Sequence, residues 1–184
     1  MFFGNNFSFK IVNYYIWTHY QTINSINMIS KRIEEELNKQ IHNEAYSSQF
    51  YLSMAIWAED QGFEGVSSFM YRHSDEERMH MLKLVKFVNE RGGKAIVPAL
   101  AAPPSDYKGL LDLFSQLLEH EMEITNKINE LVHITLQEKD YTTHNFLQWY
   151  VSEQIEEEAL ARTVLDKLKI IGDEKGGGLY LFDR

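Results

Sequence analysis

The sequence contains no cysteine. This absence excludes disulfide bonds, thiolate zinc sites and iron centres held by cysteine. Nothing in the sequence therefore indicates an oxidising compartment, and we expect the protein to be cytoplasmic.

Proline and glycine are also scarce, with 3 and 10 residues respectively in a chain of 184. Most of them lie between or beyond long periodic segments, a distribution that is typical of an all-α protein with few turns. The length and a hydrophobic content of 44% suffice for one domain with a substantial core.

Basic residues and long apolar runs are lacking as well. The chain has 18 Lys and Arg against 27 Asp and Glu, a formal net charge of -9. Nucleic acid is therefore not the expected partner, because phosphate binding needs clustered basic residues. No run of eighteen or more apolar residues occurs, so no membrane-spanning helix is expected. The acidic balance favours cations as partners.

Residues 1–27 differ in composition from the rest of the chain. Seventeen of them are Phe, Ile, Asn, Tyr or Lys, the residues specified by AT-rich codons. We expect a domain at 28–184 that starts naturally at Met28, preceded by an extension that is misassigned or weakly ordered. The alternative is a genuine surface tail.

From Ser30 onward, apolar residues recur in alternating steps of three and four, which predicts four long amphipathic helices. Ser30 is a suitable N-cap for the first helix, and Gly92 and Gly93 end the second. The predicted helices run from Ser30 to before Gly62, from Val66 to Arg91, from Leu110 to Thr135 and, after Thr142 and Thr143, through Leu168.

The connection between the second and third predicted helices is long and contains proline. Residues 93–107 include Pro98, Pro103 and Pro104, so they are not helical throughout. They indicate a crossover along a four-helix bundle, which is the ferritin-like topology rather than the simple up-down one. Residues 179–182 follow a glycine-rich stretch and predict a short fifth helix.

Six polar residues occupy positions at which the helical periodicity predicts a buried apolar residue such as Leu or Ile. Burying an ionised carboxylate costs several kcal/mol, whereas a whole domain is stable by only about 5 to 15 kcal/mol. Buried glutamates therefore need protonation or a bound cation, and we expect a cation. The six residues are Glu44, Glu77, His80, Glu121, Gln154 and Glu157.

The spacing of these residues repeats. Glu44 to Glu77 and Glu121 to Gln154 are both 33 residues, and the partners three positions further on, His80 and Glu157, repeat the match at 36. Each half of the bundle thus places one ligand on its first helix and an i, i+3 pair on its second. Two facing half-sites predict a dinuclear metal centre.

The donor set narrows the choice of metal. One imidazole among carboxylate oxygens suits iron or manganese better than copper or structural zinc. Iron would add redox chemistry.

Four motifs resemble those of bacterial non-haem ferritins, and the resemblance extends from about Met28 to the C-terminus. It implies an iron-storage protein that oxidises Fe(II) and deposits Fe(III) as a mineral inside a hollow shell of twenty-four subunits. Dioxygen or hydrogen peroxide would be the oxidant. The motifs are Asn43-Glu44-Ala45-Tyr46-Ser47-Ser48, Glu76-Glu77-Arg78-Met79-His80, Lys127-Ile128-Asn129-Glu130-Leu131 and residues 145–158.

The resemblance also implies roles for individual residues. Glu44, Glu77 and His80 would hold the first iron, with Glu77 bridging to a second iron. Tyr51 and Trp149 would be the aromatic residues beside the centre, with Tyr51 an electron donor or hydrogen-bond partner. The second iron would be held by Glu121 and Glu157 with Gln154 alongside, and an accessory third iron by Glu76, Glu153, Glu156 and Glu157.

Two departures from related families are informative. Bacterioferritins and rubrerythrins carry Glu-x-x-His where this chain has Gln154 to Glu157, so the second ion should be held less tightly and pass on to storage. Arg78 stands at the position of the bacterioferritin haem-ligand methionine, so no haem is expected. The tail ending at Arg184 is shorter than usual in the family.

Two alternatives stay open at this point. One is a rubrerythrin-like di-iron peroxidase or oxidase that does not store iron. The other is a small DNA-protecting ferritin-like protein of twelve subunits. Five histidines receive no role in any of these hypotheses: His42, His73, His120, His133 and His144.

Overall fold

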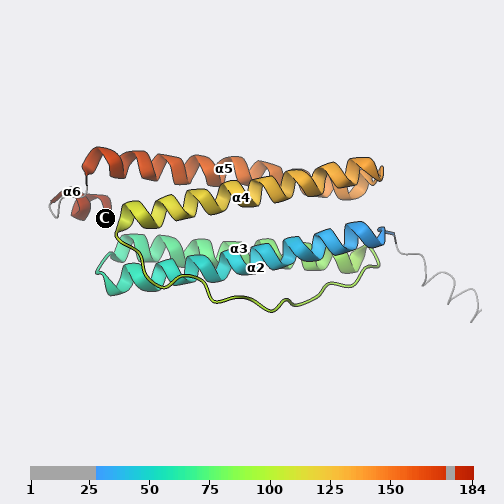
Figure 1. The fold of residues 1–184 in the computed structure, drawn as a ribbon, viewed down its shortest axis with the longest axis horizontal. Coiled ribbons are helices and arrows are strands. Elements are labelled where there is room, and N and C mark those ends of the chain that lie inside the picture. The colour runs from blue at the N-terminus through green and yellow to red at the C-terminus, as the bar shows by residue number, and fades with distance from the viewer. Residues whose placement is uncertain (1–27, 173–176) are drawn as a thin grey trace, which may run out of the picture.

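The computed structural model describes residues 28–172 and 177–184, so the expectation about residues 1–27 lies outside the described part. The described residues form five helices and no strand. Figure 1 shows four long helices lying along one another with a short one at their end. The helices are α2 (Lys31–Asp60), α3 (Glu64–Glu90), α4 (Leu110–Gln137), α5 (Tyr141–Ile171) and α6 (Gly177–Phe182).

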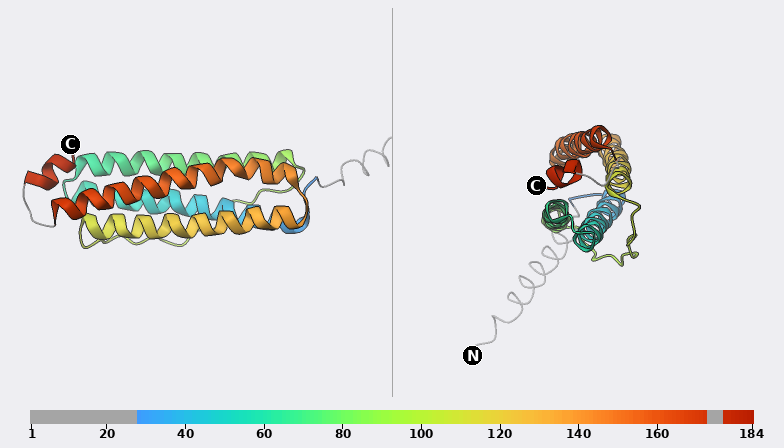
Figure 2. Two further views of the ribbon diagram at one scale, coloured as in Figure 1. Left: turned by 90° about the horizontal axis from the view of Figure 1, so that it is seen from above. Right: turned by 90° about the vertical axis from the view of Figure 1, so that its left-hand side faces the viewer.

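The helices pack as two antiparallel pairs, α2 with α3 and α4 with α5. The connection between α3 and α4 runs the length of the bundle, so these two helices point the same way (Figure 1). Seen end-on in Figure 2, the four helices surround a common axis and the connection lies outside them. The predicted ferritin-like topology with its long crossover and short fifth helix is confirmed.

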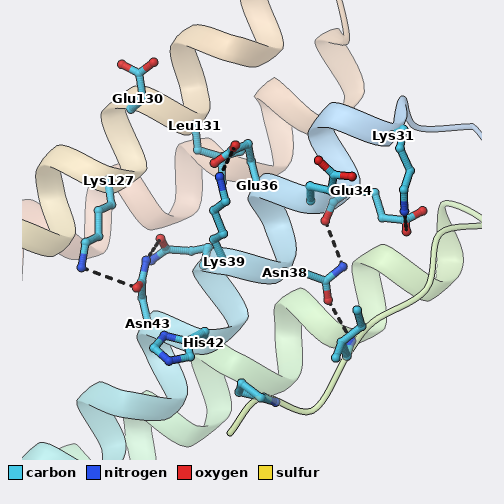
Figure 3. Close-up of a pocket in the computed structure, with 14 residues that line it drawn as sticks. Lys31, Glu34, Glu36, Asn38, Lys39, His42, Asn43, Lys127, Glu130 and Leu131 are labelled. Carbon is cyan, nitrogen blue, oxygen red and sulfur yellow. Dashed lines mark hydrogen bonds and ion pairs between the residues drawn. The ribbon is translucent and has the colours of Figure 1, made fainter. Parts of the chain in front are cut away.

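Asn38 on α2 fastens the crossover to the bundle. Its Oδ1 accepts a 2.8 Å hydrogen bond from the backbone N–H of Ile96, and its Nδ2 donates to the carbonyl of Lys94 at 3.0 Å. Figure 3 shows the Asn38 side chain directed from α2 toward the crossover. Two backbone groups of an extended segment are thus satisfied by one side chain. The crossover is therefore held along α2 although it is not helical.

The helix starts follow from their caps. Ser30 Oγ accepts a 3.1 Å hydrogen bond from the N–H of Ile33, which confirms the predicted N-cap of α2. Helix α5 begins at Tyr141, slightly earlier than predicted. The reason is Asp140, whose Oδ1 accepts from the N–H of Thr143 at 3.0 Å and acts as the N-cap.

Helix α3 also begins earlier than the sequence indicated, at Glu64, so that Gly65 lies in its first turn. The C-terminal segment explains this start. The carboxylate of Asp183 accepts a 2.9 Å hydrogen bond from the N–H of Val66. A Cβ at Gly65 would overlap the backbone of Asp183, so the close approach requires glycine there.

Two apolar clusters fill the bundle, one toward each end. One contains Tyr51, Met54 and Leu117, and the other contains Ile41, Leu84 and Ile128. On each of the four long helices, the polar positions singled out above fall between the residues that belong to the two clusters. A layer of polar side chains thus lies between the two apolar clusters. No helix in the described ranges has the length and apolar character needed to cross a membrane.

Candidate metal centre

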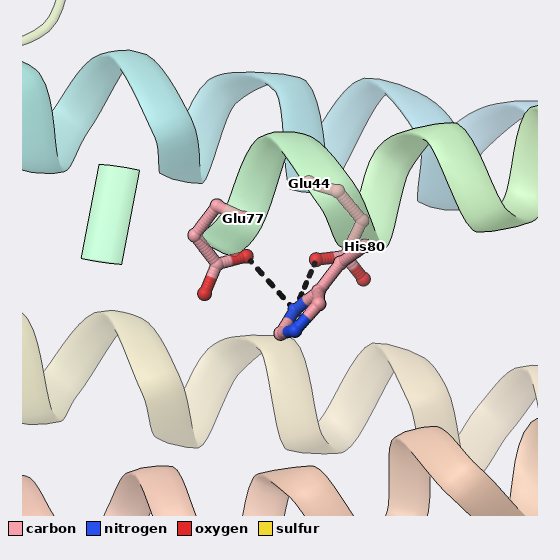
Figure 4. A group of neighbouring side chains, drawn as sticks. All are labelled: Glu44, Glu77 and His80. Atoms are coloured by element: carbon pink, nitrogen blue, oxygen red, sulfur yellow. Dashed lines mark ion pairs between the residues drawn. The ribbon is translucent and has the colours of Figure 1, made fainter. Parts of the chain in front are cut away.

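Three residues of the α2–α3 pair form one side of the polar layer. The residues Glu44, Glu77 and His80 are only 2%, 4% and 5% exposed. His80 Nδ1 lies 3.5 Å from Glu77 Oε2 and 3.9 Å from Glu44 Oε2. Figure 4 shows both carboxylates directed at the same ring nitrogen. One ligand atom from each residue falls within 4.8 Å of the other two, a spacing that can hold a metal ion.

Small residues bring α2 and α3 together next to these ligands. Ser48 Oγ donates to the carbonyl of Ser74 at 2.8 Å, and Ser74 Oγ donates to the carbonyl of Ser48 at the same distance. Ser48 is one turn from Glu44, and Ser74 is one turn from Glu77. The reciprocal pair therefore fixes the distance between the two carboxylate-bearing helices.

The α4–α5 pair supplies the opposite side of the layer. Gln154 Nε2 donates to Glu121 Oε2 at 2.9 Å and is also 3.2 Å from the carbonyl of Glu121. The other oxygen of Glu121, Oε1, is buried and has no hydrogen-bond partner among the described residues. Such an orphaned acceptor is costly unless something fills the position opposite it. A cation bound there would satisfy this oxygen.

The carboxylates repel one another and resist ionisation. Burial, with a smaller contribution from the charge of Glu157, raises the pKa of Glu77 to about 8. Burial likewise raises the pKa of Glu121 to about 8 and that of Glu157 to about 7, with neighbouring glutamates adding to both. The pKa of Glu44 is also well above its ordinary value, because of burial and then Glu77. In the absence of a cation the centre thus holds protons near neutral pH.

Residues of α5 hold His80 in place. The Tyr150 hydroxyl donates a 2.8 Å hydrogen bond to the carbonyl of His80. The Trp149 ring lies 5.0 Å from the His80 ring in an edge-on arrangement, and Lys83 Nζ lies 3.4 Å from the centre of the Trp149 ring. These contacts preorganise a ligand ring before any metal binds.

Tyr51 belongs to the apolar cluster that borders the polar layer. It is 1% exposed, and its hydroxyl is buried without a hydrogen-bond partner in the part of the chain that the structure describes. Its ring makes edge-on contacts with His73 at 6.5 Å and His120 at 6.0 Å. An unpartnered hydroxyl beside a metal-binding layer is available to a bound species.

The expected site residues are not all brought together equally. Glu76 and Glu153 approach His80 closely enough to form a second group of ligand atoms within 4.8 Å. Glu156 is exposed and belongs to none of the three such groups found in the described residues. Gln154 and Glu121 join the layer through the hydrogen bond given above.

Sequence reasoning missed two histidines near the centre. His73 joins Glu76 and Glu157 in the third group of ligand atoms, and His120 Nε2 lies 2.7 Å from Ser47 Oγ. His73 precedes Glu77 by four residues and His80 by seven, spacings that place all three on one helical face. This periodicity is the sequence feature from which a role for His73 could have been predicted. No such feature predicts that His120 contacts Ser47.

The family model of a ferritin-like domain matches residues 34–171 of the chain. A probable bacterial non-heme ferritin-like protein of Haemophilus influenzae is 48% identical over 157 residues, covering 85% of this chain and 94% of the relative. The bacterial non-heme ferritin of Campylobacter jejuni is 46% identical over 157 residues, with 85% and 93% covered.

Solved structures agree in both sequence and shape. An open-pore ferritin from the archaeon Archaeoglobus fulgidus superposes with a TM-score of 0.81 at 45% identity, covering 84% of this chain and 95% of that one. The ferritin of Chlorobium tepidum gives a TM-score of 0.78 at 41% identity, covering 84% of this chain and 94% of that one.

Proposed function

The chain belongs to the ferritin family, and from that premise we propose that it stores iron by oxidising Fe(II) at the carboxylate layer and depositing Fe(III) as mineral. The observation that carries this proposal is the set of four glutamates, each at most 9% exposed, between two apolar clusters. A placement of this kind is stable only when protons or cations compensate the charges. Iron is here the substrate of the protein.

Each half of the polar layer would supply most of the ligands for one of the two ferrous ions. Glu44, Glu77 and His80 bind the first ferrous ion, with Glu77 bridging to the second. Glu121 and Glu157 bind the second ion. Two observations support this division. Among the described residues, the buried Oε1 of Glu121 has no hydrogen-bond partner. Glu157 is close enough to Glu77 for its charge to raise the pKa of Glu77.

The paired arrangement suits the chemistry. Two ferrous ions deliver two electrons, the number that reduces dioxygen to hydrogen peroxide with uptake of two protons. The glutamates act as oxygen ligands that favour the ferric product, since hard anionic oxygens suit the higher charge. Trp149 and Tyr150 hold the ligand ring of His80, and Tyr51 offers its free hydroxyl as a hydrogen-bond partner or electron donor.

The second position should be the weaker one. Gln154 supplies an amide where a charged ligand could stand, and its N–H group is already engaged with Glu121. A loosely held ion leaves more readily for the mineral, which favours storage over a permanent cofactor. Glu76, Glu153 and Glu156, with Glu157, are the candidates for an accessory iron position. Exposed Arg78 offers no haem ligand.

Assembly and oxidant complete the proposal. We assign the protein to a hollow shell of twenty-four copies, with dioxygen or hydrogen peroxide as oxidant. The shell would enclose the mineral, and the net charge of -9 suits a cation store.

The direct test adds Fe(II) aerobically to purified protein and follows both the oxidation rate and the iron retained after gel filtration. Wild type should oxidise Fe(II) much faster than buffer and retain well more than a few iron atoms per subunit. Glu77→Ala should lose the rapid phase while still assembling. Exposed Glu123, which pairs with Lys127 at 2.7 Å, provides the control substitution Glu123→Ala. Rapid oxidation without retained iron would instead identify a di-iron oxidase.

A further inference from the structure

Gln40 on α2 is a buried polar residue that has no role in the ligand set above. It is 2% exposed and lies one turn before Glu44. One turn before Glu121, at the corresponding position in the other half of the bundle, stands the buried Leu117. An apolar side chain therefore fits this position, and a buried amide is costly there unless its polar atoms are hydrogen-bonded.

The amide of Gln40 is directed at a proposed iron ligand. Its Nε2 donates a 2.7 Å hydrogen bond to Glu44 Oε1. The other oxygen of Glu44, Oε2, lies 3.9 Å from Nδ1 of His80. No other nitrogen in the described ranges donates a hydrogen bond to Glu44. The amide thus holds one carboxylate oxygen and leaves the second one on the side of the histidine ligand.

A chain of hydrogen bonds fixes which end of the Gln40 amide faces Glu44. Lys127 Nζ lies 3.5 Å from Asn43 Oδ1, a contact that Figure 3 shows, and an ammonium group can only donate. Asn43 therefore turns its Nδ2 to Gln40 and donates to Oε1 at 2.9 Å. With its oxygen engaged in this way, Gln40 presents its N–H group to Glu44.

The other half of the centre contains the same kind of contact from a different direction. Gln154 Nε2 donates to Glu121 Oε2 at 2.9 Å across two helices, whereas Gln40 reaches Glu44 within one helix. Each half thus has one buried glutamate with an oxygen held by a glutamine amide. Because the two glutamines occupy unrelated positions, the contact with the carboxylate is what they share, and packing does not explain it.

We propose that Gln40 is a positioning residue for the first metal position, where it orients Glu44 so that Oε2 faces the ion that His80 binds. This role rests on the proposed function, because it requires a metal between Glu44 and His80. A carboxylate that is already oriented loses less conformational freedom on binding. Loss of such a supporting hydrogen bond typically lowers metal affinity by about ten- to a hundredfold.

The experiment uses the assembled full-length protein and the redox-inert cation Co(II). The variant is Gln40→Met, which matches the side chain in length but has no N–H group to donate. Gln40→Asn is a second variant, which keeps the amide polar but is too short to reach Glu44 in the same way. The matched control is Gln49→Met, the same replacement at an exposed position of α2.

Titration calorimetry measures the Co(II) affinity of both positions, and crystals grown without and with Co(II) show the orientation of Glu44. Gln40→Met should lower the affinity of the first position by about tenfold or more and leave the second unchanged. In its metal-free crystals the Glu44 carboxylate should be rotated from the wild-type orientation. Gln40→Asn should act in the same direction, and Gln49→Met should match the wild type.

The outcomes separate the inference from the proposed function. A filled centre whose first position keeps its affinity in both Gln40 variants would overturn the inference and leave the proposed function standing. Equal weakening of both positions would also overturn it, because a merely structural role affects the whole bundle. A wild-type protein that binds no Co(II) between Glu44 and His80 would overturn both.

Discussion

Gln154 Nε2 donates a 2.9 Å hydrogen bond to Glu121 Oε2 across the α4–α5 interface. The two residues are 33 positions apart, the same spacing that separates Glu44 from Glu77 in the other half of the bundle. An amide thus occupies a position whose counterpart in the other half is a carboxylate ligand. This relationship makes the two halves of the centre unequal.

Replacing the amide of Gln154 should therefore change how long an iron ion stays at the second position. In Gln154→Glu we expect tighter binding at the second position, by about tenfold or more, because a carboxylate adds a charged ligand. The same change should slow the delivery of iron to the mineral after the first turnover. Anaerobic titration calorimetry with Fe(II) measures the affinity, and multiple-turnover oxidation measures the delivery. Gln148→Glu on the exposed face of α5 is the control; unchanged affinity in Gln154→Glu would refute the inequality.

The raised pKa values predict how the metal-free protein responds to pH. Glu77 and Glu121 have pKa values of about 8 in the folded state, against about 4.3 in an unfolded chain. Between these values the folded state binds more protons, so the free energy of unfolding falls as pH rises. The pKa of His120 is lowered to about 4 by burial, so its opposite contribution fades above about pH 6.5, the pKa of an unfolded histidine.

We therefore expect the melting temperature in the presence of a chelator to fall from pH 6.5 to pH 8.5. Glu77→Gln should flatten this slope, since an amide does not ionise. A redox-inert cation such as Co(II) should stabilise more strongly at the higher pH, because binding requires deprotonated carboxylates. Differential scanning calorimetry at several pH values measures all three effects. If the slope of the wild type were identical to that of Glu77→Gln, the pKa of Glu77 would not be raised in the folded protein.

Replacing Tyr51 by phenylalanine should raise the stability of the protein but lower its activity. The hydroxyl of Tyr51 is buried without a partner among the described residues, so Tyr51→Phe should stabilise the metal-free protein by about 1 kcal/mol. It should also slow the first phase of Fe(II) oxidation while leaving the number of bound Fe(II) ions unchanged. Chemical denaturation and stopped-flow absorbance measure the two effects. Tyr46→Phe, five residues earlier on α2 and only half-buried, is the comparison, and equal oxidation rates in both variants would remove Tyr51 from the mechanism.

Much of this picture could be predicted from periodicity alone. The six polar positions can be identified because four carboxylates, a histidine and an amide stand where the helical periodicity predicts buried apolar residues. All six are buried. The proline-containing crossover was likewise predictable, because Pro98, Pro103 and Pro104 prevent a continuous helix there.

The remaining features depend on contacts between distant segments. The sequence assigned no role to His73, because its proximity to Glu157 on α5 follows from the packing of two helices. The early start of α3 could not be anticipated for the same reason: its cap is Asp183, 117 residues away from Val66. Helix periodicity predicts which face is buried but carries no information on what lies opposite.

The central claim is that side chains from all four long helices converge to bind two ferrous ions in each subunit. Anaerobic Fe(II) titration of the metal-free protein, followed by Mössbauer spectroscopy, tests it most directly. We expect two bound high-spin Fe(II) ions per subunit, the second held more weakly than the first, with the count reduced to at most one in Glu77→Ala and unaffected in Glu123→Ala. Binding of fewer than two ions, or an unchanged count in Glu77→Ala, would contradict the account.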